Sequence, residues 1–256
     1  MRKKILLSFL LTLNSTLLLS QSSTYTILLT GASFADAGNG WFEIGCKKIN
    51  ATPINKAIGG EAIANTANRM IEGTLYSKHE LEIIDAFVIM HVHNQDVFNS
   101  PGLKNDYTEY NIPFDRSDYA AAFDYVIKKY MTDCYNLKND STSVYYNTKH
   151  GKPALIILCT DWHDGRTLYN SSVRKLSEKW GFPLVEFDKF IGFSKNQLHP
   201  VTKKQHSLIY SSDSQVINEE TFGWHPLRGK NSPIQLKMGA IFSDLIKKTL
   251  ISSTNE

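Results

Sequence analysis

Apolar and polar residues follow two different patterns along the chain. Short apolar runs rich in β-branched residues predict five strands, at residues 25–30, 51–55, 85–92, 153–160 and 183–187. Between and after these runs, apolar residues recur at helical spacing and predict helices at residues 61–71, 118–131, 168–180 and 236–250. Because continuous apolar strands alternate with amphipathic helices, we predict an α/β protein whose parallel sheet is covered on both faces.

Two segments show neither pattern, residues 98–116 and residues 192–223. Both are longer than the connections that compact domains usually leave without secondary structure. We expect loops there, of the kind that often serve as lids or binding loops. No repeat or linker divides the remainder of the chain, so a single domain is predicted.

The N-terminal residues have the pattern of a secretory signal peptide. A basic start at Arg2–Lys4 precedes a mostly apolar run, Ile5–Leu19, and small polar residues follow at Ser20–Ser23. The run is short for a membrane span, and polar residues interrupt it. We therefore predict a signal peptide at residues 1–22, a domain at residues 23–256, and a secreted or periplasmic protein without a stable membrane anchor.

The net charge gives no support for nucleic-acid binding, and the cysteines give none for a disulfide framework or a zinc site. The formal net charge is +3, and Lys and Arg are spread along the chain, so nothing favours a nucleic-acid partner. Three widely spaced cysteines form neither a disulfide framework nor a zinc motif. Cys46 and Cys134 could pair in an oxidising compartment, whereas Cys159 lies in an apolar run and is expected to be buried.

Reactive side chains follow the predicted strands. In parallel α/β sheets, functional groups gather beyond the carboxyl ends of the strands. Ser33 follows the first strand, Gly60 the second and Asn94 the third, and His225 comes after the fifth strand and its long connection. A serine nucleophile needs a base, and a developing oxyanion needs N–H donors. We therefore predict Ser33 as nucleophile and His225 as base. The oxyanion hole would consist of the backbone N–H groups of Ser33 and Gly60 and the side-chain amide of Asn94.

The same residues carry a family resemblance. The sequences "GAS" (31–33), "AIGGEA" (57–62), "VHNQ" (92–95) and "GWHP" (223–226) resemble, in order, the four blocks of the SGNH hydrolases, or GDSL-like esterases and lipases. The resemblance extends from Thr24 to about Leu250 and looks closest to divergent, signal-bearing members from Bacteroides-type bacteria. It implies a three-layer, flavodoxin-like α/β/α sandwich with a five-stranded parallel sheet. It also implies that Ser33, Gly60, Asn94 and His225 hold the family's functional positions.

The chain departs from the family pattern in each of three blocks. Ala32 replaces the Asp of Gly-Asp-Ser, and Val92 and Gln95 replace the Gly and Asp of Gly-x-Asn-Asp. Phe222 stands three residues before His225, where the family has the Asp that orients the imidazole. The site is then either a Ser33–His225 dyad or a triad with another acceptor. The alternatives for that acceptor are Glu219, Glu220, Asp161, Asp164 and a backbone carbonyl.

Other polar residues near the predicted strand ends have less specific roles. His93 and His163 are expected to line a substrate pocket. Arg166 would bind a substrate carboxylate or sugar hydroxyl, or else form a salt bridge at a helix start. His91, His93, His163, Asp161 and Asp164 are metal-ligand types, but their spacing matches no recognised metal motif, so no metal is predicted.

The resemblance implies an esterase that acts through an acyl-enzyme and needs no cofactor. A small ester or an acylated carbohydrate is the expected substrate, and an acetyl ester on carbohydrate is preferred because the family includes many carbohydrate esterases. The alternative is a catalytically impaired protein of the same fold that binds a glycan or another ligand in the same cleft. The missing Asp at Phe222 favours that alternative.

Overall fold

A five-stranded parallel sheet forms the centre of the molecule. The structure is a computed structural model, and it describes residues 25–35, 38, 40–91, 119–193 and 197–250. The strands lie in the order β2-β1-β3-β4-β5, and every neighbouring pair is parallel. Their bounds are β1 Tyr25–Gly31, β2 Ala51–Asn55, β3 Ala86–Met90, β4 Ile156–Cys159 and β5 Leu184–Val185. This is the strand order of flavodoxin-like proteins.

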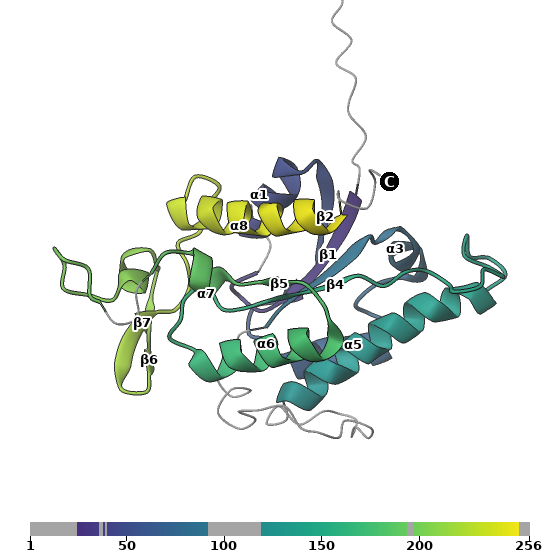
Figure 1. The fold of residues 1–256 in the computed structure, drawn as a ribbon, viewed down its shortest axis with the longest axis horizontal. Coiled ribbons are helices and arrows are strands. Elements are labelled where there is room, and N and C mark those ends of the chain that lie inside the picture. Colours follow the sequence, from purple (N-terminus) through teal and green to yellow (C-terminus); the bar gives the residue numbers. More distant parts are fainter. Residues whose placement is uncertain (1–24, 36–37, 39, 92–118, 194–196, 251–256) are drawn as a thin grey trace, which may run out of the picture.

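Helices cover both faces of the sheet (Figure 1). Helices α1 (Trp41–Lys48) and α8 (Pro233–Leu250) pack against each other on one face. On the other face, α5 (Tyr119–Asn136) contacts both α2 (Ile63–Ile71) and α6 (Thr167–Trp180). The three-layer α/β/α sandwich predicted from the sequence is therefore confirmed.

Each predicted strand and helix overlaps an observed one. The strongest strand predictions came from apolar runs, and the side chains of these runs are buried in the structure. All residues of β3 and β4 are buried, as expected for strands covered on both faces. Helix α1 lies outside the four predicted helix ranges, and four shorter helical segments were not predicted either. They are α3 (Lys78–Ile83), α7 (Phe187–Phe190), and the 3₁₀ turns η1 (Leu137–Asn139) and η2 (His206–Ile209).

The expectation of a structureless segment at residues 192–223 is wrong. The segment contains η2 and a two-stranded antiparallel hairpin, β6 (Ser214–Ile217) and β7 (Glu220–Gly223). Exposed and buried residues alternate along β6, which is the pattern of a half-buried strand. Asn218 and Glu219 connect the two strands with positive φ angles of 49° and 67°. Positive φ at both loop positions is typical of the two-residue turns that match hairpin twist.

Several predictions fall on residues outside the described ranges. The signal peptide, the loop predicted at residues 98–116, His93 and Asn94 all lie there, and they remain predictions. Within the described ranges, no helix has the length and apolar character needed to cross a membrane.

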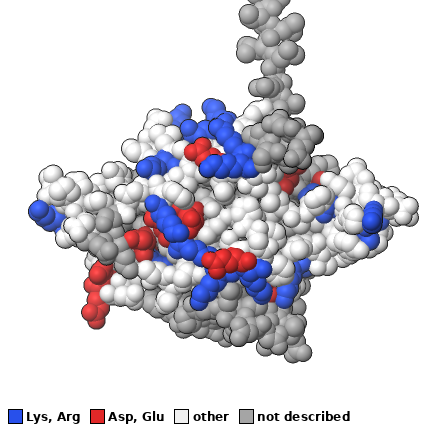
Figure 2. Space-filling view, in the orientation of Figure 1, with Lys and Arg blue, Asp and Glu red and all other residues white. Residues whose placement is uncertain are grey.

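The three cysteines are free and buried. Cys46 lies on α1 and Cys134 on α5, which cover opposite faces of the sheet, so these two thiols do not pair. Figure 2 shows acidic and basic side chains mixed over the face that carries α8, α7 and α6. That mixture agrees with the mild net charge of the sequence.

Candidate functional site

Ser33 lies in a tight turn directly after β1. Residues Gly31 and Met90 are partners in the β1–β3 register, and a Cβ at Gly31 would lie 2.4 Å from the Met90 carbonyl oxygen. Glycine therefore allows the two backbones to approach at this point. The backbone N–H of Ala35 donates to the Ala32 carbonyl at 2.9 Å and closes the turn. The sheet thus presents Ser33 at its carboxyl end.

Ser33, His225 and Asp213 form a chain of hydrogen bonds. The Ser33 Oγ lies 2.8 Å from His225 Nε2. The other ring nitrogen, Nδ1, lies 2.6 Å from Asp213 Oδ2. The second carboxylate oxygen of Asp213 accepts the backbone N–H of His225 at 2.8 Å. The carboxylate therefore holds both the ring and the main chain of this histidine.

This arrangement defines the roles of the imidazole nitrogens. Desolvation acts to raise the pKa of Asp213, but hydrogen bonds from the backbone and ring of His225 bring that pKa below its ordinary value. The carboxylate is an acceptor only, so Nδ1 carries the proton and donates it. The lone pair of Nε2 then faces Ser33, which is the tautomer that a general base requires.

The β6–β7 hairpin brings Asp213 to the histidine. The two residues are twelve positions apart in sequence. Ser214 and Gly223 are partners in the hairpin register, so Asp213 and Trp224 extend the same ladder by one step. The Trp224 N–H donates to the Asp213 carbonyl at 3.0 Å, and the Ser212 N–H donates to the His225 carbonyl at 2.9 Å. Pairing of the two strands therefore brings Asp213 beside His225 across the ladder, although the two residues are distant in sequence.

None of the four carboxylates proposed from the sequence is the partner of His225. Glu220 is exposed on β7, and within the described residues it makes no hydrogen bond to His225. Phe222, where the SGNH resemblance would place an Asp, is buried and stacks on His163 with ring centroids 5.4 Å apart. Asp213 was missed because no hairpin was predicted. Apolar and polar residues do not alternate in "SQVINEETFG" (214–223), and its turn lacks the usual glycine, so the sequence carries no clear hairpin signal.

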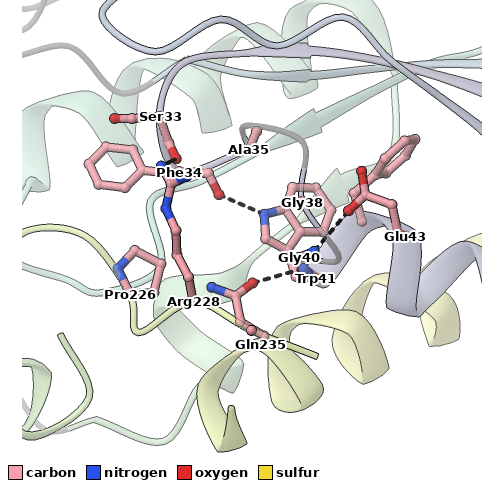
Figure 3. A pocket seen from close by; sticks show the side chains of 12 residues that line it. Ser33, Phe34, Ala35, Gly38, Gly40, Trp41, Glu43, Pro226, Arg228 and Gln235 are labelled. Atoms are coloured by element: carbon pink, nitrogen blue, oxygen red, sulfur yellow. Dashed lines mark hydrogen bonds between the residues drawn. The ribbon is translucent and has the colours of Figure 1, made fainter. Parts of the chain in front are cut away.

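Aromatic rings and two polar contacts stabilise the turn at Ser33 and Phe34 and the position of His225 beside it. The His225 ring stacks on Trp224 at 5.4 Å and lies 5.2 Å from the Phe34 ring. The Arg228 guanidinium donates to the Ser33 carbonyl at 3.2 Å, and the Trp41 indole donates to the Phe34 carbonyl at 3.0 Å. Figure 3 shows Phe34, Trp41 and Arg228 around the pocket beside Ser33.

Two of the three predicted oxyanion donors lie in the described part of the chain. Among the described residues, the backbone N–H groups of Ser33 and Gly60 have no hydrogen-bond acceptor. The Ile58 N–H donates to the Gly31 carbonyl at 3.0 Å, so the loop that carries Gly60 runs beside the end of β1. Gly60 has φ of 83°, a conformation that favours glycine. Asn94 lies outside the described residues.

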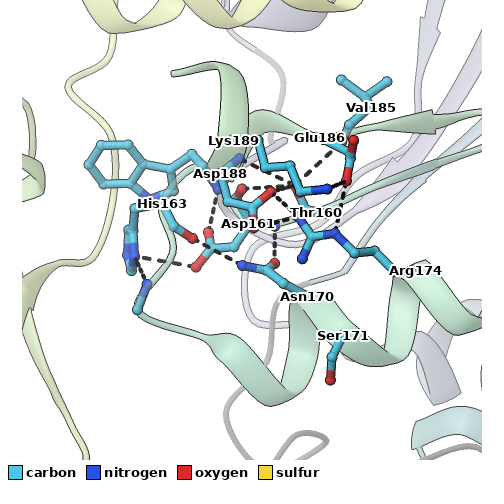
Figure 4. Close-up of polar contacts among 12 residues, drawn as sticks. Thr160, Asp161, His163, Asn170, Ser171, Arg174, Val185, Glu186, Asp188 and Lys189 are labelled. Carbon is cyan, nitrogen blue, oxygen red and sulfur yellow. Dashed lines mark hydrogen bonds and ion pairs between the residues drawn. The ribbon is translucent and has the colours of Figure 1, made fainter. Parts of the chain in front are cut away.

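Asp161, His163 and Arg166 lie in a buried cluster shown in part in Figure 4, and the Arg166 guanidinium carbon lies 5.4 Å from the centroid of the Phe34 ring. Asp161 Oδ2 lies 3.0 Å from Arg166 Nε. His163 accepts the Gly165 N–H at Nδ1 (3.0 Å) and donates from Nε2 to the Gly223 carbonyl (2.9 Å). The expected substrate contacts of His163 and Arg166 are therefore wrong, since their side chains are 1% and 3% exposed. Arg166 instead forms the salt bridge at a helix start that was the alternative.

Burial also fixes the charge state of His163. Desolvation lowers its pKa below the ordinary 6.5, with the Arg166 charge adding to this and Asp161 opposing it. The neutral ring uses both nitrogens within the protein. His91 likewise bonds Thr66 through Nε2 at 2.8 Å. In the described ranges, no three His, Cys, Asp or Glu side chains converge in a way that could hold a metal ion.

The fold is similar to that of solved structures described as lipases. One is a possible lipase from Chitinophaga pinensis DSM 2588, with a TM-score of 0.54 and 13% sequence identity, and the match covers 88% of this chain and 98% of that chain. Another is the lipase Lip_vut3 from a goat rumen metagenome, with a TM-score of 0.50 and 9% identity, covering 87% and 97%. At these identities the similarity shows a shared fold. No curated protein matches the chain.

A family model described as "Domain of unknown function (DUF5040)" matches residues 24–250. That range contains every described strand and helix, and Ser33, Asp213 and His225 with them. The chain therefore belongs to the DUF5040 family.

Proposed function

We propose that this protein is a serine hydrolase of SGNH type that cleaves a carboxylic ester. One observation carries the proposal: Ser33 Oγ lies 2.8 Å from His225 Nε2, and His225 Nδ1 lies 2.6 Å from Asp213. A hydroxyl, an imidazole and a carboxylate connected in this order are the elements of an activated serine nucleophile. The similarity of the fold to structures described as lipases agrees with hydrolase chemistry.

The first half of the reaction transfers the acyl group to the enzyme. Ser33 Oγ attacks the ester carbonyl carbon while its proton passes to His225 Nε2. Asp213 stabilises the imidazolium that forms, because its carboxylate accepts the Nδ1 proton. The N–H groups of Ser33 and Gly60, with the Asn94 amide, would stabilise the negative oxygen of the tetrahedral intermediate. The intermediate collapses as Nε2 returns the proton to the leaving alcohol.

The second half releases the acid. Water takes the place of the alcohol and gives a proton to His225 Nε2 as it attacks the acyl-enzyme. Collapse of the second tetrahedral intermediate returns that proton to Ser33 and frees the carboxylic acid. The chain's own residues supply every proton transfer, so the reaction as proposed uses no cofactor.

The proposed substrate is a small ester, and within that class an acetyl ester on a carbohydrate. The preference for carbohydrate rests on the SGNH resemblance. Trp224, partly exposed beside His225, is an aromatic surface of the kind that stacks on sugars. Trp41 and Trp162 are buried and do not serve this role. The predicted signal peptide supports a secreted or periplasmic location, where acylated polysaccharides are accessible.

The alternative of an impaired, ligand-binding protein depended on the missing carboxylate at Phe222. Asp213 supplies a carboxylate within hydrogen-bond distance of the imidazole. The observation that favoured impairment is therefore accounted for, and catalysis is the better proposal.

Ester hydrolysis tests the proposal. The purified protein is assayed with p-nitrophenyl acetate and butyrate, and by acetate release from acetylated oligosaccharides, beside Ser33→Ala and His225→Ala. Ser171→Ala and His79→Ala are matched controls, because Ser171 is partly exposed on α6 and His79 is exposed on α3, and neither belongs to the proposed triad. Turnover that both site variants lose and both controls keep supports the proposal. Wild-type rates equal to those of Ser33→Ala on all three substrates would contradict it.

A further inference from the structure

One buried segment contacts both strands of the hairpin that carries Asp213 and His225. The segment is the connection between β4 and α6, residues 160–166. Its side chains Trp162, His163 and Arg166 are each between 0% and 3% exposed. The proposed reaction does not use these side chains.

Two of these side chains bind the main chain just before His225. His163 donates from Nε2 to the Gly223 carbonyl at 2.9 Å. Trp162 donates from Nε1 to the Trp224 carbonyl, also at 2.9 Å. The two carbonyls immediately before His225 thus accept hydrogen bonds from buried side chains. These bonds restrain the backbone position of the proposed base.

The third side chain binds the other strand. The Arg166 guanidinium donates to the Gln215 side-chain oxygen on β6, two residues after Asp213. Asp161, itself fully buried, contacts Arg166 Nε through Oδ2, and its Oδ1 accepts the Trp162 N–H at 2.7 Å. The cluster therefore connects the strand of the carboxylate to the strand of the base.

Close packing reinforces these hydrogen bonds. The Phe222 ring stacks on the His163 ring with an interplanar angle of 5°. A Cβ at Gly165 would lie 2.9 Å from Phe222 Cδ1 and 3.0 Å from the His163 ring, so only glycine fits between them. On the opposite side, the Ser207 hydroxyl accepts the Gly223 N–H at 2.9 Å. The hairpin is held between η2 and the segment at residues 160–166.

We propose that Trp162, His163 and Arg166 are positioning residues for the Asp213–His225 pair. A two-stranded hairpin is marginally stable by itself, and β6–β7 forms a sheet separate from the central one. Its orientation toward Ser33 must therefore come from such contacts. The inference rests on the proposed function, because it assigns these residues to the alignment of that triad. A displacement of about 1 Å at a reacting group can cost about 10²-fold in rate.

The test compares three variants by kcat and KM on the ester that the protein turns over. His163→Leu removes the donor to Gly223, whereas His163→Gln retains an N–H at the position of Nε2. We expect kcat to fall about 10- to 100-fold in His163→Leu with KM little changed, and to recover in His163→Gln. Val126→Ala is the matched control, because Val126 is buried on α5 away from the hairpin and its truncation lowers stability without reaching the site.

A second measurement needs no substrate. The Nδ1 proton shared by His225 and Asp213 gives a downfield proton resonance in NMR spectra, and we expect this signal to broaden or disappear in His163→Leu and return in His163→Gln. Trp162→Phe removes only the indole donor and should lower kcat and weaken the downfield signal as His163→Leu does. It tests the positioning role if His163→Leu does not fold. Folded Trp162→Phe or His163→Leu protein with wild-type kcat and an unchanged signal would overturn the inference.

The two proposals fail in different ways. A protein with no ester turnover but with a downfield signal that depends on His163 would refute the proposed function and keep the positioning role for the pair. A protein with Ser33-dependent turnover that is indifferent to His163 and Trp162 would refute the positioning role alone.

Discussion

Replacing Asp213 by Asn distinguishes the proposed Ser33–His225–Asp213 triad from a Ser33–His225 dyad and from a triad with another carboxylate. Asp213 accepts two hydrogen bonds from His225, one from the ring at 2.6 Å and one from the backbone at 2.8 Å. An amide has only one oxygen for these two donors. If the amide oxygen retains the backbone N–H, its NH₂ group faces Nδ1 and favours the tautomer with the proton on Nε2. That tautomer cannot accept the Ser33 proton. If the amide turns, two N–H donors face each other instead.

The expected loss of kcat in Asp213→Asn follows from these hydrogen bonds and from the solvent exposure of the Asp213 side chain. The same exchange in a buried serine-protease triad costs about 10⁴-fold in kcat, which corresponds to about 5.4 kcal/mol. The Asp213 side chain is 47% exposed, so water competes for the imidazole and screens the charge. We therefore expect a smaller loss in Asp213→Asn, about 10²- to 10³-fold in kcat, or about 2.7–4.1 kcal/mol in the activation barrier. KM should change little, because the carboxylate does not face the substrate carbonyl.

The assay is steady-state hydrolysis of the best ester found for the wild type. Glu220→Gln is the matched control, since Glu220 lies on the same hairpin and was one of the carboxylates considered from the sequence. It should retain the wild-type kcat. If Asp213→Asn also retained it while Ser33→Ala did not, the carboxylate would be dispensable and a dyad would be the correct description. Loss in Glu220→Gln instead would refute the assignment of the carboxylate.

Three further predictions concern other parts of the structure. Asn94→Ala should lower kcat about 10²- to 10³-fold with unchanged thermal stability, as expected for an oxyanion donor; equal kinetics would remove it from the site. Gly31→Ala would place a Cβ 2.4 Å from the Met90 carbonyl, so it should lower the free energy of unfolding by about 1–3 kcal/mol in urea titrations, and an unchanged midpoint would refute that contact. Burial lowers the pKa of His163 below 6.5, so only the unfolded chain protonates this ring as the pH falls below 6.5. Its contribution to stability is therefore present above that pH and is lost below it. Thermal unfolding between about pH 7.5 and pH 5 should show a shallower decline in His163→Gln than in the wild type; parallel profiles would contradict the buried neutral ring.

The central sheet was predictable because its signals are local. Strands β1, β3 and β4 are short apolar runs with buried side chains, so no long-range information is needed to recognise the centre of the sheet. The positions of Ser33 and His225 followed from the strand ends and from the resemblance to SGNH sequences. The structure places these two side chains 2.8 Å apart although they are 192 residues apart in sequence.

The carboxylate could not be predicted in the same way. Asp213 reaches His225 only because two strands pair across a turn at Asn218 and Glu219, and that turn lacks the glycine that usually marks it. The error on His163 has the same origin. A histidine after a buried strand suggests a pocket residue, but in this fold the hairpin covers it and binds Nε2 through the Gly223 carbonyl, while Nδ1 accepts the Gly165 N–H.

The most direct test of the account is covalent labelling of the nucleophile. A fluorophosphonate reagent reacts with an activated serine and needs no knowledge of the natural ester. Mass spectrometry of the digested wild-type protein should show one adduct, on the peptide that contains Ser33, and the adduct should be absent in Ser33→Ala and form much more slowly in Asp213→Asn. An unlabelled wild type, or an adduct on another serine that persists in Ser33→Ala, would contradict the assignment of Ser33, His225 and Asp213 as a catalytic triad.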